Sequence, residues 1–173
     1  MDTIILIILA ILLWSVVRAA VSLAPWVPTY KRNLEQINNL VDLQPGQSFL
    51  EIGCGNARVC NFVAKKNPKV KVVGIELAFI FFAISWLRVK ISGIKNLEII
   101  YGNALKMDMS EFDVIYVFGM EKSMNNKMRD IVWQQMKPGS RLVSYIFSID
   151  AWPGKEEKIK DEKDGFGVYV YYK

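Results

Sequence analysis

The sequence contains no histidine and only two cysteines. Without histidine, the Ser-His-Asp and Cys-His mechanisms of hydrolases are excluded. Cys54 and Cys60 lie six positions apart with no further metal-ligating residues beside them, so no metal site and no disulfide framework is predicted. This cysteine usage fits a reducing cytoplasm. There is no internal repeat or low-complexity tract either, and a chain of 173 residues then predicts one domain with a small appendage.

Basic residues are not gathered into a stripe. The net charge is +5, but the 22 lysines and arginines are scattered along the chain, so a nucleic-acid partner is not expected. Apolar residues make up 52% of the sequence, which is high for a soluble protein, and their excess is concentrated in the first 28 residues.

The apolar run near the start extends from Ile4 to Ala24 with one charge, Arg18. These 21 residues compare with the roughly 20 needed to cross a bilayer. The run predicts a transmembrane anchor over residues 1–24, with a removed signal peptide or a buried helix as alternatives. Basic residues gather on its C-terminal side. The positive-inside rule therefore predicts a single-pass protein of the cell membrane, with its domain on the cytoplasmic side.

Residues 48–57, which read SFLEIGCGNA, predict a buried strand that breaks into a tight turn. Gly53 and Gly55 let the backbone bend and let a ligand approach, because neither carries a Cβ atom. A helix expected over residues 57–66 then directs its free N–H groups at the same place. Together these elements predict a strand-turn-helix cradle for a nucleotide.

Two further apolar strands end in polar residues. Glu76 closes the strand over residues 71–76, where an acid can accept hydrogen bonds from both hydroxyls of a ribose. Asn103 and Ala104 close the next strand, and the amide can pair with an adenine amine. Further strands are expected over 112–119 and 141–149, with a late antiparallel strand over 167–172. The charged run 155–164 is expected to form a loop or an edge strand.

Two helices are expected outside the strand series. Residues 25–41 predict a proline-stiffened linker followed by an amphipathic helix, so that the domain itself spans residues 42–173. The helix over 77–91 has two apolar stripes. The first is expected to cover the sheet and holds Ile80, Ile84, Leu87 and Ile91. The second is expected to contact the N-terminal helix or another part of the domain, or else a membrane surface, and holds Phe79, Phe82, Trp86 and Val89.

The spacing of small residues at 53, 55 and 57, with Glu51 two positions ahead, resembles the turn of class I S-adenosylmethionine (AdoMet) methyltransferases. It differs from the dinucleotide fingerprint, because position 58 is arginine instead of a small residue. The resemblance implies an α/β Rossmann-like fold with a mostly parallel sheet, AdoMet as cofactor and methyl transfer as the reaction.

Three short runs narrow the resemblance: PWVPT at 25–29, QPG at 44–46 and VFG at 117–119. Over about residues 25–173 the chain resembles small protein lysine methyltransferases. These include archaeal broad-specificity enzymes and membrane-anchored mitochondrial ones that act on ATP synthase subunit c or the adenine nucleotide carrier. The resemblance implies a protein substrate, a membrane protein in the anchored members. Two departures are Asn56-Ala57 in place of Asp-Gly, and Met120-Glu121 in place of Val-Pro.

The expected site follows from these motifs. Around the methyl acceptor we expect Phe118, Gly119 and Tyr116, with Trp152 as a further candidate for a hydrophobic entrance. The expected cofactor-binding residues are Thr29, Glu51, Gly53, Cys54, Gly55, Glu76, Leu77, Asn103, Ala104 and Phe118. Two other functions stay open: methylation of a lipid or other membrane-soluble small molecule, and a binding module that keeps the fold without turnover.

Overall fold

The computed structural model describes residues 2–20, 29–119, 129–160 and 167–173. Its elements, in chain order, are α1 (Asp2–Ala20), η1 (Lys31–Asn33), α2 (Leu34–Val41), β1 (Ser48–Ile52), α3 (Arg58–Lys66), β2 (Lys71–Glu76), α4 (Phe79–Ser92), β3 (Leu97–Tyr101), η2 (Ala104–Lys106), β4 (Val114–Val117), α6 (Arg129–Gln135), β5 (Arg141–Tyr145), β6 (Glu156–Lys160) and β7 (Gly167–Tyr172). The predicted strands are therefore confirmed: β2 and β7 have the predicted bounds, the strands predicted over 112–119 and 141–149 are shorter, and the charged run contains the edge strand β6.

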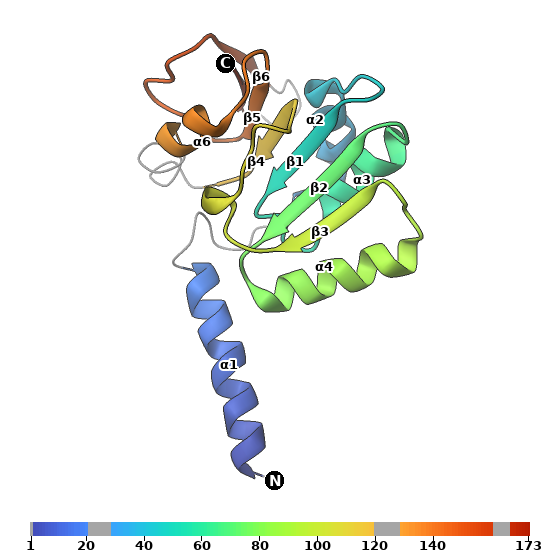
Figure 1. Ribbon diagram of the computed structural model, residues 1–173, viewed down its shortest axis with the longest axis vertical. Helices are drawn as coiled ribbons and strands as arrows, with labels where there is room; N and C mark the ends of the chain where they lie inside the picture. Colours follow the sequence, from blue (N-terminus) through green and yellow to red (C-terminus); the bar gives the residue numbers. More distant parts are fainter. Residues whose placement is uncertain (1, 21–28, 120–128, 161–166) are drawn as a thin grey trace.

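The described strands form one sheet in the order β3-β2-β1-β4-β5-β7-β6. Strands β1 to β5 pair in parallel, whereas β7 runs antiparallel to β5 and β6 antiparallel to β7. In Figure 1 the arrowheads of β1, β2 and β3 point toward the same edge of the sheet. The strand order reverses between β1 and β4, and ligands of open α/β sheets bind at such a switch point.

Apolar side chains form one core on each face of the sheet. One core packs α2 and α3 against residues such as Phe49, Val72 and Tyr116. The other contains Leu50, Ile115 and residues of α6. Because neighbouring positions of a strand face opposite sides, the interior strands β1 and β4 are apolar almost throughout, as expected for a sheet covered on both faces.

Helix α4 packs on the sheet with part of the second stripe, which was expected to contact the N-terminal helix, another part of the domain or a membrane surface; Phe79 and Trp86 of that stripe stay 51% and 45% exposed. Phe82 and Val89 pack against the core, and Ser85 between them is fully buried. In contrast, Leu87 is 54% exposed and Ile91 is 78% exposed. The assignment of the two stripes from the sequence was wrong, because both are apolar and periodicity alone cannot tell them apart. The aromatic pair Phe82 and Tyr101, 5.4 Å between ring centroids, helps to fix the observed orientation.

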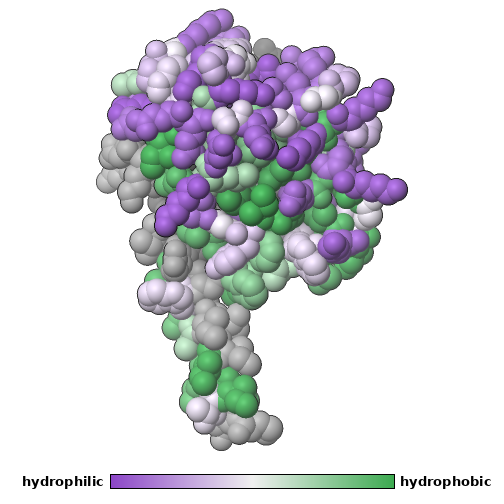
Figure 2. All heavy atoms as spheres, viewed as in Figure 1, coloured by the Kyte–Doolittle hydropathy of each residue, from purple (hydrophilic) through white to green (hydrophobic). Residues whose placement is uncertain are grey.

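Helix α1 covers most of the predicted apolar run, and its end nearest the domain lies close to α4 (Figure 1). Figure 2 shows apolar residues along it, in contrast to the mostly hydrophilic surface of the upper part of the domain in this view. Within the part of the chain that the structure describes, no helix is long and apolar enough to cross a membrane. The transmembrane anchor predicted over residues 1–24 is therefore not confirmed. The described helix ends at Ala20, and residues 21–24 lie outside the described ranges.

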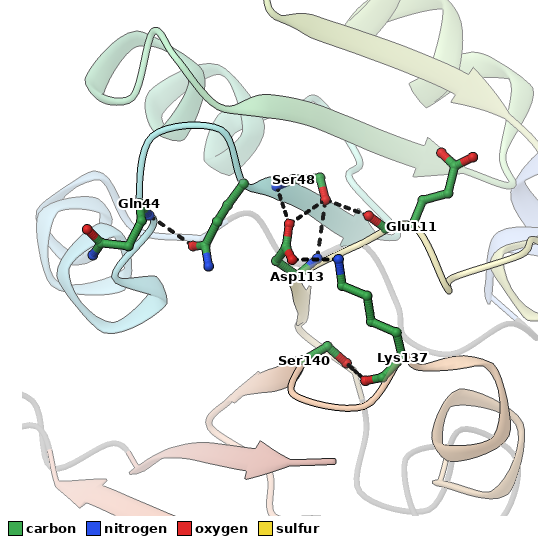
Figure 3. Close-up of polar contacts among 7 residues, drawn as sticks. Gln44, Ser48, Glu111, Asp113, Lys137 and Ser140 are labelled. Carbon is green, nitrogen blue, oxygen red and sulfur yellow. Dashed lines mark hydrogen bonds and ion pairs between the residues drawn. The ribbon is translucent and has the colours of Figure 1, made fainter.

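A polar network joins the amino ends of β1 and β4, at the edge of the sheet opposite the glycine turn (Figure 3). The Asp113 carboxylate accepts hydrogen bonds from the Ser48 backbone N–H at 2.8 Å and from the Ser48 hydroxyl at 2.9 Å. Lys137 pairs with the other Asp113 oxygen at 2.5 Å. Since these contacts join residues that are distant in sequence, they help to fix the register of β4 against β1.

Candidate active site

The turn after β1 adopts left-handed backbone conformations at alternate positions. The φ angles are +69° at Gly53, +54° at Gly55 and +55° at Ala57. Glycine adopts this region at little cost, whereas alanine is strained there. The backbone N–H groups of Gly53 and Cys54 both donate to the Ile75 carbonyl, at 2.9 and 3.1 Å. The turn is thus tied to the carboxyl end of β2.

Glu76, the last residue of β2, reaches over this turn. One carboxylate oxygen accepts a hydrogen bond from the Gly55 backbone N–H, and the other accepts one from the Ala78 N–H, both at 2.8 Å. The residue is only 8% exposed. Each carboxylate oxygen accepts two hydrogen bonds in favourable geometry, so a second acceptor position remains on each one. Glu76 is therefore joined to the glycine turn, a contact that the sequence did not predict, and it stays available for the predicted hydrogen bonds from ribose hydroxyls.

Glu51 faces the beginning of α3. Its carboxyl accepts hydrogen bonds from the Cys60 backbone N–H at 2.9 Å and from the Cys60 thiol at 2.7 Å. The first of these contacts satisfies an N–H in the first turn of the helix, which has no partner within the helix. Burial, only partly offset by the hydrogen bonds from Cys60, raises the pKa of Glu51 to about 8. Near neutral pH the group is therefore mainly a neutral acid that fastens the helix behind the turn.

Cys54 and Cys60 lie together beneath the turn, against the backbone of Gly74. A Cβ atom at position 74 would lie 2.9 Å from the Cys60 sulfur and 3.0 Å from the Cys54 sulfur. Both thiols are buried, and burial raises the pKa of Cys60 well above its ordinary value. Any larger residue at position 74 would overpack this region, because strand β2 passes this close to the two sulfur atoms.

The residues expected around adenine lie after β3. Asn103 caps the short helix η2: its side-chain oxygen accepts a hydrogen bond from the Leu105 N–H at 3.0 Å. Ala104 is buried, and the Gly102 N–H donates to the Glu76 carbonyl at 2.9 Å, which joins this segment to the end of β2. Leu77 is half-buried beside them. The structure therefore brings this part of the expected cofactor site together.

Thr29 precedes the turn in the chain and Phe118 follows it. The Arg58 guanidinium donates to the Thr29 carbonyl at 2.6 Å, so the segment before η1 is held against the start of α3. Phe118 and Gly119 follow β4, whose Val117 is paired with Ile52 immediately before the turn. Phe118 therefore lies at the switch point between β1 and β4.

The acceptor residues expected from the sequence are only partly brought together. Tyr116 is fully buried below Phe118, and burial raises its pKa well above the ordinary value. Trp152 packs instead against Trp133 and Tyr171 in the core of the opposite face, so it does not line this entrance. Strand β7 pairs antiparallel with β5, and its Tyr171 contacts Trp152. The prediction that Trp152 lines the entrance did not consider this contact.

Tyr145, beside Phe118, and its hydrogen-bond partner Asn33 were not predicted from the sequence. Tyr145 ends β5, and its ring lies 5.4 Å from that of Phe118. Asn33, from η1, donates its side-chain amide hydrogen to the Tyr145 hydroxyl. The parallel pairing of the fourth and fifth predicted strands would have placed position 145 next to position 118, but no sequence signal links either to Asn33.

The turn has room for a ligand. A Cβ atom at Gly53 would meet no other atom within 4 Å, so the space in front of it is open. The carboxylate of Glu76 lies beside this space, and Asn103 follows the neighbouring strand. An acid for ribose hydroxyls, a polar residue for adenine and a turn with an open front fit the nucleoside and methionine parts of AdoMet.

Comparison with known proteins supports the assignment of an AdoMet site. A family model described as the ANTKMT methyltransferase domain matches residues 51–156. The protein-lysine N-methyltransferase of Saccharolobus islandicus is 27% identical over 149 residues, which cover 85% of this chain and 92% of that protein. A probable ribosomal RNA small subunit methyltransferase A of Methanosarcina acetivorans is 33% identical over 127 residues, 72% of this chain but only 45% of that protein.

Among solved structures, an RNA methyltransferase from Salinibacter ruber in complex with S-adenosyl-L-homocysteine is similar with a TM-score of 0.75 and 25% identity. The match covers 84% of this chain and 92% of that one. Fold, site and relatives together define a class I AdoMet-dependent methyltransferase. The chain belongs to the ANTKMT methyltransferase domain family.

Proposed function

We propose that this methyltransferase acts on lysine side chains of a protein. The main support for this proposal is the aromatic, half-buried entrance at Phe118, which lies at the switch point next to the glycine turn. The similarity to the Saccharolobus islandicus protein, which is named a protein-lysine N-methyltransferase and matches over most of both chains, supports the same acceptor.

In the proposed site, Glu76 accepts hydrogen bonds from the ribose hydroxyls through the acceptor positions left on its carboxylate. Asn103 and Ala104 border the adenine, and the turn from Gly53 to Gly55 holds the methionine part. Because the Asn103 oxygen already caps η2, its contact with adenine uses the second lone pair of that oxygen or the amide N–H₂. Glu51 and Cys54 act from behind the turn by fixing its shape.

AdoMet supplies a methyl group that is already activated on a sulfonium. The protein therefore has to align the acceptor and exclude water. A lysine must lose its proton before it can accept the methyl group, and an apolar entrance favours this loss by disfavouring the ammonium form. Phe118 and the neighbouring rings supply that environment. Glu121, which follows the VFG run in the sequence, lies outside the described residues.

The test is transfer of labelled methyl groups from AdoMet to an extract of the source cells that is separated afterwards into protein, lipid and RNA. We expect label in protein, recovered as methyllysine after hydrolysis. Gly53→Val and Glu76→Ala should abolish transfer, because a β-branched residue is strained at a φ of +69° and the second change removes the sugar contact. Glu98→Gln, an exposed change on β3, is the matched control.

An RNA acceptor is the second candidate. It is supported by the RNA methyltransferase of Salinibacter ruber, the solved structure described above. Label found only in RNA would favour that candidate over lysine, and label found only in lipid would reject both.

A further inference from the structure

The side of helix α4 that is turned away from the sheet is apolar. Ile84, Leu87 and Ile91 lie on it at helical spacing, away from the side on which Phe82 and Ser85 pack inward. These three residues, called the outer stripe below, are all exposed. A helix that is apolar on both sides is normally covered on both, by protein or by lipid. The sheet covers one side of α4, and the described residues leave the outer stripe open.

Basic residues border the outer stripe. By helical periodicity, Arg88 falls on one side of the stripe and Lys90 on the other, and the sequence of α4 contains no acidic residue. Arg88 donates to the Asn56 carbonyl at 2.7 Å, which does not neutralise its charge. The Lys90 ammonium lies 5.5 Å from the centroid of the Trp86 ring, and both side chains prefer a boundary between polar and apolar surroundings. An apolar stripe with basic borders is typical of helices that lie on membranes with anionic lipids.

Helix α1 indicates what kind of partner covers this surface. It contacts α4, and its residues Ile4, Ile5, Leu6 and Ile7 are all exposed. Four consecutive helical residues point in directions spread around the whole helix, so this part of α1 is apolar on every side. One protein surface cannot cover such a helix on every side, whereas lipid can surround it. Figure 2 shows further hydrophobic residues on the lower part of the domain, where Figure 1 places α4.

We propose that the outer stripe of α4 docks on the surface of a bilayer that contains anionic lipids, beside α1. The contact is interfacial, because α4 lies along the surface with its other side on the sheet, and Arg88 and Lys90 face the lipid headgroups. In Figure 1 the arrowheads of β2 and β3 point toward the part of the domain next to α1, so docking holds the glycine turn near the bilayer. Docking of this kind does not depend on which group the enzyme methylates.

The experiment uses the full chain and vesicles of phosphatidylserine and brominated phosphatidylcholine. Leu87→Cys carries a fluorophore on the outer stripe, and Lys158→Cys carries the same fluorophore on β6, at the opposite edge of the sheet from β3. Cys54 and Cys60 are buried, so the introduced thiols react first. Bromine on the acyl chains quenches only nearby fluorophores. We expect position 87 to lose roughly half of its emission or more, since docked helices reach the acyl boundary, and position 158 to keep its emission.

Lys90→Gln tests the charge contribution and has a matched control. Lys158 also lies over an aromatic ring, 5.1 Å from the centroid of Tyr169, so Lys158→Gln removes the same charge from the same kind of contact. With the fluorophore at position 87, Lys90→Gln should lower the ratio of docked to free helix about fivefold on the anionic vesicles, as expected for one basic residue at such a surface. Lys158→Gln should leave this ratio unchanged, and neither change should matter on vesicles of phosphatidylcholine alone.

The proposal is overturned by an unquenched fluorophore at position 87, by equal quenching at positions 87 and 158, or by equal effects of the two lysine changes. A fluorophore at position 87 that becomes shielded without vesicles as the chain concentration rises would instead assign the outer stripe to a second copy of the chain. Failure of the proposed function has a different signature, namely absence of methyllysine in the labelling experiment while bromine still quenches position 87.

Discussion

The buried carboxyl of Glu51 makes the stability of this domain depend on pH in an unusual direction. Burial raises its pKa from the ordinary 4.5 to about 8. The folded protein therefore keeps a proton on Glu51 over a range in which the unfolded chain has lost it. Where the folded state binds more protons, the free energy of unfolding falls as pH rises. The stabilisation from this group is complete below pH 4.5 and is lost as pH rises through 8.

The magnitude follows from the pKa values. For each pH unit between the two pKa values, the free energy of unfolding falls by about 1.4 kcal/mol, so the full loss of stability above pH 8 is roughly 5 kcal/mol. Between pH 5 and pH 8 the loss is roughly 3–4 kcal/mol, because the unfolded carboxyl is already partly ionised at pH 5. Domains of this kind are stable by about 5–15 kcal/mol in total, so the effect is large. Glu51→Gln keeps an oxygen that can accept from Cys60 and removes the titration.

The assay is urea unfolding of the wild type and of Glu51→Gln at several pH values from 5 to 8, under reducing conditions. The variant should gain stability relative to the wild type by roughly 3–4 kcal/mol over this range. Comparing the two proteins cancels the titration of all other groups. Glu98→Gln, on the exposed side of β3, should show no such trend. Parallel stabilities of wild type and Glu51→Gln across the whole range would refute the reasoning.

Three further changes can be followed by thermal melting. Asp113→Asn removes the ion pair with Lys137 and should cost about 1–2 kcal/mol near neutral pH. Burial alone would raise the pKa of Asp113, but hydrogen bonds, first that with Lys137, lower it, so the stabilisation should disappear as pH falls below 3.8. Gly74→Ala should cost about 1–3 kcal/mol through overpacking, and Cys60→Ala in the same chain should recover part of it. Tyr171→Phe should cost about 1–3 kcal/mol, because a buried backbone N–H at 2.6 Å from the hydroxyl loses its acceptor. Unchanged melting in any of these variants would contradict the corresponding contact.

Much of the cofactor half of the site could be predicted from the sequence because it depends on strand ends. Glu76 and Asn103 each follow an apolar strand, and parallel pairing of neighbouring strands brings such ends to one edge. The role of Glu51 could not be predicted from strand ends. Its side chain is used by the first turn of α3, a contact that depends on the packing of the helix against β1.

The acceptor half was harder to predict because its residues come from distant parts of the chain. Asn33 reaches Tyr145 across 112 positions, and the stacking of Phe147 on Phe118 depends on a strained turn at Ile146. Trp152 was misplaced for a related reason, since β7 and β6 return beside β5 and draw it into the opposite core. Periodicity identifies these segments as apolar but does not tell which face each will cover.

The two backbone contacts of Glu76 affect how AdoMet binds. Both carboxylate oxygens are anchored, one by the N–H group of Gly55 in the turn and the other by the N–H group of Ala78 after β2. In the proposed site the carboxylate therefore loses little rotational freedom on association, and its share of the entropic cost of binding is met during folding. Association with AdoMet should accordingly resemble the docking of a rigid receptor, with little change in the backbone around position 76.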